Sequence, residues 1–475
     1  MAKIDYNKIG FKCGIEVHQQ LEGKKLFCNC PTEIRKDKPD FTFDRRLRAS
    51  AGESGEVDVA ASYEQQKNKL FTYWAYDDVN CLVEMDEEPP EPINQEALKT
   101  TIQVARMLNC ELVDKIQVMR KTVVDGSNTS GFQRTALVGR NGFVEMNKKK
   151  IGIPTVCLEE EACQVMKRTK DHDVYNLSRL GIPLIEIATD PDIGSPEECR
   201  EVAAKIGMIL RSTGACKRGI GSIRQDVNIS IKRGARTEIK GFQDLRSIPK
   251  VIDNEIKRQQ ELIKKKKKIN KEVRKAESDF TTSYLRPMPG AARMYPETDI
   301  ETIIPKEVKF EKIETMDDRI KRYKKNYGLN DDLAKLAVKF ENKEGFVLEG
   351  YFKKYKDAKF VVQFFTSTPK ELKKRYNVII DPRPIAEKVL DKVSSEELPK
   401  GSVVELLADY GKTKKLNFGK FKGISTDKLE KEIKKIVEKN KGAPVGALMG
   451  IIMGKFRGKV DGKQAMKILK KHHKF

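Results

Sequence analysis

Two residues with complementary chemistry lie two positions apart near the start of the chain. Glu16 and His18 belong to the alternation of apolar and polar residues over 10–21, which is typical of a strand whose side chains point to two faces in turn. A carboxylate and an imidazole should therefore project from one face. Together they suit a metal ion, a phosphate-bearing ligand or proton transfer, whereas a solvated edge strand would explain the same pattern without any site.

Acidic residues follow at two further predicted strands. Residues 151–161 run apolar and then carry Glu159, Glu160 and Glu161 in succession. Adjacent carboxylates repel one another unless a cation or basic groups lie near. Glu186 is the lone charge of a short aliphatic strand, which makes it a candidate site residue; an outward-facing position is the alternative.

The segment 221–240 predicts a β-hairpin with one strongly charged face. Arg224 and Asp226 alternate with isoleucine and valine, and Lys240 follows beyond a turn at Gly234. Four predicted strands thus each present acids or bases, and we expect them to form the floor of a site for a charged ligand. Oxygen ligands with a single imidazole favour magnesium or manganese over zinc.

Two further segments are candidates for binding phosphate. The small, polar loop 125–135 offers backbone amides and Ser130, although its spacing matches no P-loop. Prolines and a glycine make 284–299 a stiff loop, on which Arg286 and Arg293 would suit clamping phosphate or carboxylate. A solvated turn and a rigid linker are the respective alternatives.

The nine cysteines are an odd number in a chain without a secretion signal, which argues against a disulfide framework. Cys28 and Cys30 lie close together, and Cys81 is a possible third ligand from a later loop. Three thiolates without an evident fourth ligand make zinc a weaker prediction than magnesium.

Length and composition predict two to four domains and a polyanionic partner. The 475 residues are 39% apolar and 34% charged, and the formal net charge is +23. Such an excess favours nucleic acid, although lysine enrichment by composition bias or thermal adaptation competes with this interpretation. No apolar run is long enough to span a bilayer, so we expect no membrane partner and a cytoplasmic location.

The order of the predicted elements indicates an α+β chain. Apolar periodicity predicts helices over 93–108, 195–213 and 251–275 among the strands, the last with a five-lysine run. Beyond about residue 304, Lys/Glu-rich helices with aliphatic stripes follow one another to the C-terminus. The mostly antiparallel strands should therefore form one part of the chain and the helices another.

Six motifs together resemble the tRNA-dependent amidotransferase family, which includes the bacterial B subunits and the archaeal E subunits. The similarity is collinear along the chain. The motifs are GIEVHQQL from Gly14, LFCNCP from Leu26, LEEEA from Leu158, GIPLIEI from Gly181, GSIRQDVNIS from Gly221 and RPMPGAARMYPETD from Arg286.

The resemblance implies a fold, a reaction and a set of ligands. It implies a mostly antiparallel cradle-shaped catalytic domain (1–300), a helical domain (301–400) and a helical tRNA-binding tail (401–475). ATP would activate the γ-carboxylate of glutamate on tRNA(Gln), and ammonia from an asparaginase-like D subunit would displace the phosphate, within a heterotetramer of two subunits each. By motif position, the magnesium ligands fall on His18, Glu160 and Glu186, with Glu16 and Glu159 adjacent.

One feature departs from the family pattern. Archaeal E subunits commonly carry an inserted synthetase-like domain, and here only about residues 264–278 stand in its place. Two other functions are alternatives: a metal-dependent RNA phosphoesterase, which would use the same carboxylates, and a non-catalytic tRNA-binding protein, which would keep only the basic tail. The first would cleave RNA without ATP, and the second would tolerate loss of Glu160 and Glu186.

Overall fold

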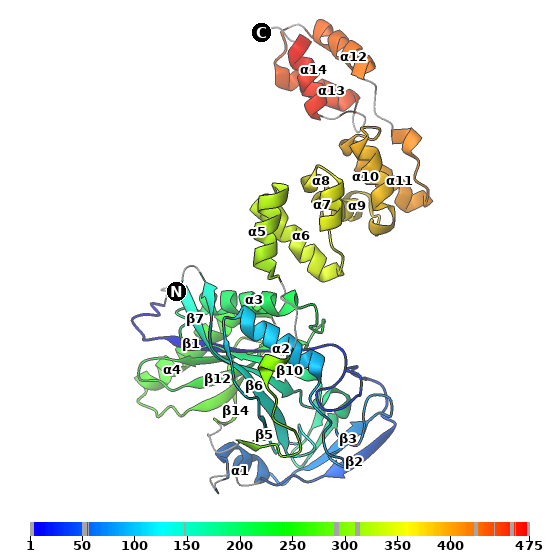
Figure 1. The fold of residues 1–475 in the computed structure, drawn as a ribbon. Helices are drawn as coiled ribbons and strands as arrows, with labels where there is room; N and C mark the ends of the chain where they lie inside the picture. Colours follow the sequence, from blue (N-terminus) through cyan, green and yellow to red (C-terminus); the bar gives the residue numbers. More distant parts are fainter. Residues whose placement is uncertain are drawn as a thin grey trace. The chain divides into compact units, whose positions relative to one another are not determined.

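The computed structural model describes residues 4–49, 55, 57–146, 149–242, 244–288, 294–308, 314–421, 426–440, 442–456, 460 and 462–472. The chain divides into two compact units, Met1–Thr315 and Met316–Phe475 (Figure 1). The first unit is built on two sheets, and the described residues of the second form helices only. The predicted α+β class is confirmed.

An eleven-stranded, mostly antiparallel sheet forms the body of the first unit. Its strands follow the order β14-β13-β12-β11-β1-β10-β7-β6-β5-β15, and β4 pairs with β6. The strands are β1 (Lys12–Gln20), β4 (Glu111–Leu112), β5 (Val118–Thr122), β6 (Phe132–Met146), β7 (Lys149–Glu160), β10 (Pro183–Ala188), β11 (Ile223–Ser230), β12 (Thr237–Phe242), β13 (Glu272–Ala276), β14 (Thr282–Pro287) and β15 (Met294–Pro296).

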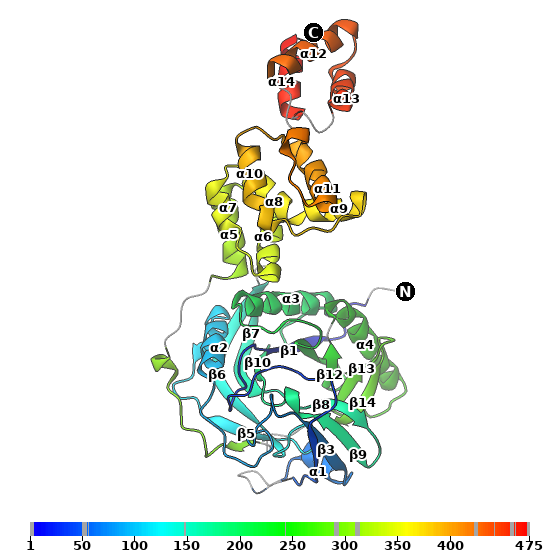
Figure 2. The ribbon, with the colours of Figure 1, turned by 90° about the vertical axis from the view of Figure 1, so that its right-hand side faces the viewer.

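Three helices cover one side of this sheet, as Figure 2 shows. They are α2 (Gln95–Met107), α3 (Pro196–Ser212) and α4 (Ile248–Lys264). The side chains of Asn94 and Ser195 cap α2 and α3, which fixes where these helices begin. Apolar side chains of the helices and of the inner sheet face form one core. The first two predicted helices are confirmed.

Strand β1 confirms the predicted division of its side chains between two faces. Cys13, Ile15 and Val17 are buried in the core with α2 and α3. Glu16 and His18 alternate with them and therefore project from the opposite face. The alternation along β1 that buries its apolar side chains in the core therefore also places Glu16 and His18 together on the opposite face.

The second sheet of this unit has four strands in the order β2-β3-β9-β8. Its strands are β2 (Phe41–Arg45), β3 (Leu70–Ala75), β8 (Gln164–Arg168) and β9 (His172–Asn176), and α1 (Val59–Gln65) precedes β3. Tyr73 stacks between Phe43 and Tyr175, with ring centroids 5.2 and 6.0 Å away. The rings therefore serve as core.

Two predicted elements differ from the structure. The helix expected over 251–275 ends at Lys264, because Lys266 takes a positive φ of 54° and β13 then pairs in parallel with β12. Arg286 lies on strand β14 rather than on a stiff loop, paired opposite Val273. Hydrogen bonding along the sheet edge outweighs the local helix and loop preferences.

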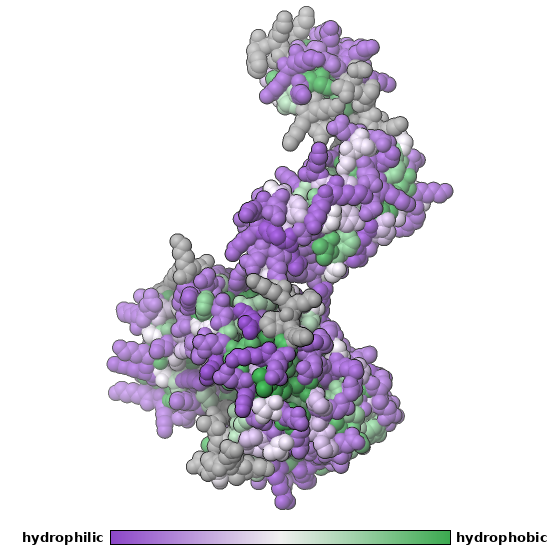
Figure 3. Space-filling view, in the orientation of Figure 1, coloured by the Kyte–Doolittle hydropathy of each residue, from purple (hydrophilic) through white to green (hydrophobic). Residues whose placement is uncertain are grey.

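The second unit consists of helices in its described residues. They are α5 (Met316–Tyr327), α6 (Asp331–Glu344), α7 (Glu349–Lys354), α8 (Ala358–Thr366), α9 (Thr368–Tyr376), α10 (Ala386–Ser394), α11 (Val403–Thr413), α12 (Thr426–Lys439), α13 (Val445–Lys455) and α14 (Gly462–His472). Hydrophilic side chains cover most of the face that Figure 3 presents. Helices α12–α14 share an apolar core of their own. A further domain boundary near residue 400 stays a prediction.

Among the described residues, no helix combines the length and the apolar character needed to cross a membrane.

Candidate active site and metal centres

Strands β1, β10 and β7 bring the first group of predicted residues together. Antiparallel pairing sets His18 opposite Glu186, and His18 Nε2 lies 3.1 Å from Glu186 Oε2. Glu159 at the end of β7 joins them, so that one potential ligand atom from each residue lies within 4.8 Å of the others. Lys121 of β5 pairs with Glu159 at 2.6 Å and lies 4.0 Å from Glu186.

The charges of this group stabilise one another. Burial favours the neutral acid of Glu186, but the charges of Lys121 and His18 outweigh it and hold the pKa of Glu186 well below its ordinary value. Burial likewise opposes protonation of His18, yet the hydrogen bond to Glu186 raises the pKa of the imidazole. His18 and Glu186 therefore form an ion pair when no cation separates them.

A second acidic group shares His18. Strand β11 sets Asp226 opposite Glu16, and ligand atoms of Glu16, His18 and Asp226 lie within 4.8 Å of one another. Lys240 of β12 pairs with Asp226 at 2.6 Å. Burial and the charge of Glu186 raise the pKa of Glu16 to about 7. The prediction that β1 and the hairpin share one charged face is confirmed.

The donor set of these two groups fits a divalent cation. His18 Nδ1 is buried, and no hydrogen-bond partner for it occurs among the described residues. A buried imidazole nitrogen without a hydrogen-bond partner costs desolvation energy, unless it binds a further ligand such as a cation held by the neighbouring carboxylates. Oxygen donors with one imidazole suit magnesium or manganese.

Arg224 lies on the predicted face, opposite His18, but its charge is engaged. Its guanidinium lies 2.5 Å from Glu161 Oε2, and Gln20 donates a hydrogen bond to the same oxygen at 2.9 Å. Burial would raise the pKa of Glu161, yet the charge of Arg224 dominates and lowers it to about 2. Arg224 and Glu161 therefore form a rigid pair at the edge of the two groups.

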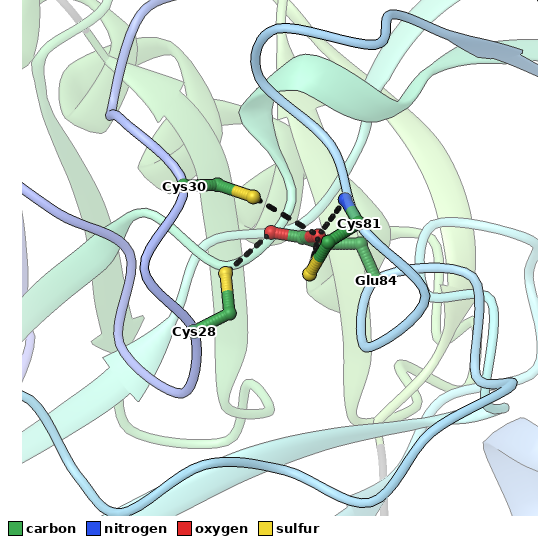
Figure 4. A group of neighbouring side chains, drawn as sticks. All are labelled: Cys28, Cys30, Cys81 and Glu84. Carbon is green, nitrogen blue, oxygen red and sulfur yellow. Dashed lines mark hydrogen bonds between the residues drawn. The ribbon is translucent and has the colours of Figure 1, made fainter.

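The predicted cysteines converge, and a carboxylate joins them (Figure 4). Cys28, Cys30, Cys81 and Glu84 each offer an atom within 4.8 Å of the others. The Glu84 carboxylate accepts hydrogen bonds from the Cys28 thiol at 2.9 Å and the Cys81 thiol at 3.2 Å. This group could hold a metal ion, and Glu84 is the fourth ligand that the sequence prediction lacked.

The surroundings of the cysteine group favour the anionic form of Cys30, whereas hydrogen bonds with Cys30 and Cys81 raise the pKa of Cys28. Hydrogen bonds from Cys28 and Cys81 lower the pKa of Cys30 to about 4. The ammonium of Lys25 is fully buried and lies 2.9 Å from Glu84 Oε1. A buried cation beside three thiols and a carboxylate offsets part of the negative charge that these ligands carry when a metal is bound.

Glu160 and Ser130 face a different space from the acidic groups. Both line a small pocket that also contacts Lys25, Glu84 and Arg134. Glu160 Oε2 accepts a hydrogen bond from the Arg134 backbone N–H at 3.1 Å. Among the described residues, Glu160 belongs to neither of the two acidic groups whose potential ligand atoms lie within 4.8 Å of one another. Its predicted role as a magnesium ligand stays a prediction.

The two predicted arginines of the segment 284–299 have different outcomes. Arg286 lies on β14, at the opposite edge of the large sheet from β15. Arg293 lies outside the described residues. Their predicted role in clamping phosphate therefore stays a prediction.

Comparison with known proteins decides the family. A family model described as the GatB/GatE catalytic domain matches residues 11–311. The chain belongs to the GatB/GatE family. The match covers both sheets, the acidic groups and the cysteine group.

Several relatives in the GatB/GatE family are named as the E subunit of glutamyl-tRNA(Gln) amidotransferase. The protein of Methanocaldococcus jannaschii is 37% identical, over 92% of this chain and 93% of its own. That of Methanococcus maripaludis strain C7 is 36% identical over 91% of both chains. That of Archaeoglobus fulgidus is 56% identical over 263 residues, which are 55% of this chain and 43% of its own.

This GatB/GatE chain is shorter than the relatives that it matches along most of its length. The alignment with the Methanocaldococcus jannaschii protein spans 589 positions but takes in 92% of 475 residues. About 150 of the aligned positions therefore have no counterpart in this chain.

Sequence reasoning missed three residues of the site. Glu84 stands three positions after Cys81, the spacing at which two ligands of one metal often lie, and that signal could have found it. Lys121 and Arg134 give no local signal. They reach the carboxylates only because β5, β6 and β7 are neighbours in the sheet.

Proposed function

We propose that this GatB/GatE chain is the E-type member of a glutamyl-tRNA(Gln) amidotransferase, which converts Glu-tRNA(Gln) to Gln-tRNA(Gln). The observation that carries the proposal is the polar face of β1, where His18 joins two acidic groups and keeps a buried nitrogen without a partner among the described residues. The name shared by relatives that match along most of the chain supports the choice of substrate.

The first step would be phosphorylation of the glutamyl γ-carboxylate. A carboxylate oxygen attacks the γ-phosphorus of ATP, and ADP leaves. His18, Glu159 and Glu186 would hold Mg²⁺, which supplies charge neutralisation during phosphoryl transfer. Lys121 orients Glu159 and Glu186 through its two contacts.

The second step would be amidation of the acyl phosphate. The nitrogen of ammonia attacks the carbonyl carbon, the C–O bond to phosphate breaks, and one proton leaves the nitrogen. No protein nucleophile is needed, because activation has already provided a good leaving group. Glu16 and Asp226 complete the charged face, and Lys240 holds Asp226 in place.

Other residues keep the roles predicted from the sequence. We propose that Arg224 and Arg293 stabilise charge on the transferred phosphoryl group. Ser130 and Arg286 remain candidates for ATP contacts. Lys240 would contribute to the ATP site indirectly, by holding Asp226 in place.

The partners follow from the substrate and from the charge distribution. The helical unit, Met316–Phe475, has 39 Lys and Arg against 21 Asp and Glu, so it carries +18 of the formal +23. We propose that this unit binds tRNA(Gln) and that an asparaginase-like D subunit supplies ammonia, in a cytoplasmic heterotetramer of two subunits each. We propose that the aligned positions of the relatives that have no counterpart in this chain correspond to an insertion near residues 264–278.

We further propose that Cys28, Cys30, Cys81 and Glu84 bind Zn²⁺. Three sulfur donors and one oxygen donor suit tetrahedral zinc, and a site with four protein ligands is structural rather than catalytic. Such a site would tie the loop of Cys28 and Cys30 to that of Cys81 beside the cavity.

The function is tested by following the amino acid on mischarged tRNA. Wild type, Glu186→Gln and the surface control Glu96→Gln are given Glu-tRNA(Gln), ATP, Mg²⁺ and ammonium, with and without the D-type partner. We expect glutamine and ADP from wild type and Glu96→Gln, and at least about 100-fold less glutamine from Glu186→Gln. If folded wild type forms neither glutamine nor an acyl phosphate under all conditions, the proposal is wrong.

Zinc is tested by metal analysis of the purified protein. We expect about one zinc per chain in wild type and in Cys110→Ser, and a much lower content in Cys81→Ser and Glu84→Ala. Cys110 is a suitable control because it is also half-buried but lies outside the group. Equal zinc content in all four proteins would exclude this ligand set.

A further inference from the structure

A connected set of buried charges joins the sheet edge at β15 to the cavity beside Glu160. Glu297 directly follows β15 and is 0% exposed. Its carboxylate accepts hydrogen bonds from Arg120 Nε at 2.9 Å and from Arg134 Nε at 2.7 Å. Arg134 in turn donates its backbone N–H to Glu160, and its guanidinium lies 3.4 Å from the other Glu160 oxygen.

The strand register extends this connection to the acidic group of His18. Arg120 and Arg134 lie opposite each other on β5 and β6, and both guanidinium groups lie against the Phe132 ring, 4.6 and 5.1 Å from its centroid. Lys121, the next residue on β5, is the one that pairs with Glu159. A change in the position of β5 must therefore move Arg120 and Lys121 together.

The backbone ties Glu297 to the same strand. Its N–H donates to the Val118 carbonyl at 2.9 Å, and Gln117 donates from its side chain to the Glu297 carbonyl at 3.1 Å. The carboxylate also accepts the backbone N–H of Asp299 at 3.1 Å. Glu297 is thus fixed by the main chain, and the two arginines adapt to it.

Stability alone is a weak explanation for such an arrangement. Burying an ion pair costs desolvation energy that its attraction hardly exceeds, and apolar residues of similar volume often serve stability as well. Charge-assisted hydrogen bonds, by contrast, impose direction on the groups that they join. The hydrogen bonds of Glu297 with Arg120 and Arg134 therefore fix where these side chains lie at the end of β5.

We propose that Glu297 is a positioning residue of the amidotransferase site, which fixes Arg120 and Arg134 and thereby places Lys121 against Glu159 and the Glu160 carboxylate at its cavity. The inference rests on the proposed function and deepens it. Glu297 acts through these side chains.

The test compares Glu297→Gln with Glu255→Gln. Glu255 is a matched control: it is 1% exposed, pairs with Arg258 and Arg274, and lies on α4, where it stabilises the packing against β13 and β14. Both variants should lose stability. We expect only Glu297→Gln to lower kcat for glutamine formation by about 10- to 100-fold, with KM for the tRNA nearly unchanged.

Two further measurements separate positioning from damage to the fold. Binding of Mn²⁺, followed by calorimetry, should weaken by about 10- to 100-fold in Glu297→Gln and stay near the wild-type value in Glu255→Gln. Arg134→Lys should cost little more in the Glu297→Gln background than either change costs alone, because both break one connection.

The outcomes distinguish this inference from the proposed function. If Glu297→Gln keeps the kcat and Mn²⁺ affinity of wild type, or if Glu255→Gln loses both to the same extent, the positioning role is refuted. If wild type forms no glutamine but Mn²⁺ affinity falls only in Glu297→Gln, the reaction is wrong and the positioning role is supported.

Discussion

Replacing Glu16 with glutamine should stabilise the first unit at alkaline pH and change it little at acidic pH. Burial and the charge of Glu186 raise the pKa of Glu16 from 4.5 to about 7. Below pH 4.5 the side chain is protonated in both the folded and the unfolded chain, so it contributes no pH dependence. Between these values the folded state keeps a proton that the unfolded state loses, and stability therefore falls as pH rises.

The magnitude follows from the size of the shift. Each pKa unit corresponds to about 1.36 kcal/mol, so ionised Glu16 costs up to about 3 kcal/mol of unfolding free energy above pH 7. Glutamine has nearly the same shape but no charge to desolvate. We expect Glu16→Gln to gain up to about 3 kcal/mol over wild type at pH 8, and much less at pH 5.

Urea unfolding followed by tryptophan fluorescence measures this difference for the right unit. Trp74 is the sole tryptophan and lies on β3 in the first unit. Measurements at pH 5 and pH 8 with a chelator would be compared with those in excess Mg²⁺. Under the proposed function, Mg²⁺ would bind beside the ionised carboxylate, stabilise wild type and so reduce the gain. The exposed control Glu96→Gln should match wild type throughout. A Glu16→Gln protein no more stable than wild type at pH 8 would refute the reasoning.

Two further predictions follow from single contacts. The charge of Arg224 lowers the pKa of Glu161 to about 2. This pair therefore stabilises the fold above pH 4.5 by up to about 3 kcal/mol, and the contribution is lost as pH falls toward 2. Glu161→Gln should show a smaller loss of stability over this pH range in the same fluorescence assay. Gly126→Ala should destabilise the first unit by at least about 2 kcal/mol, since the added Cβ would lie 2.3 Å from Phe71 and 2.7 Å from Tyr175 at a φ of +86°; an unchanged thermal midpoint would contradict this.

The periodicity of the sequence predicted the faces of the strands but not their neighbours. Alternation places Glu16 and His18 on one face whatever the fold, because the side-chain period of a strand is two. Among Glu159, Glu160 and Glu161 the same rule cannot choose. That choice depends on which residues of β6, β10 and β11 lie opposite β7 and β1, and strand pairing is a property of the whole sheet.

Local signals were weakest where long-range pairing overrides them. Residues 272–276 continue a basic, helix-like composition, yet they complete the parallel partner of β12. Helix propensity amounts to a few tenths of a kcal/mol per residue, which one ladder of backbone hydrogen bonds and the burial of Val273 can exceed. The prolines of this segment argue against a helix, and the described residues 287–288 and 294–296 contain none, but prolines did not exclude short edge strands.

The division of charge between the two units explains why composition and site point to the same function by different routes. The sheet unit carries only +5 of the formal +23, as 54 Lys and Arg against 49 Asp and Glu, so its cations are largely matched by carboxylates. Such pairs act over a few ångströms and fix geometry, as Lys121 does for Glu159. The unmatched +18 of the helical unit acts over a Debye length and can attract a polyanion without defining its position. Under the proposed function, recognition of tRNA and chemistry on its glutamyl end would make opposite demands on charge, and this chain would meet them in separate parts of its sequence.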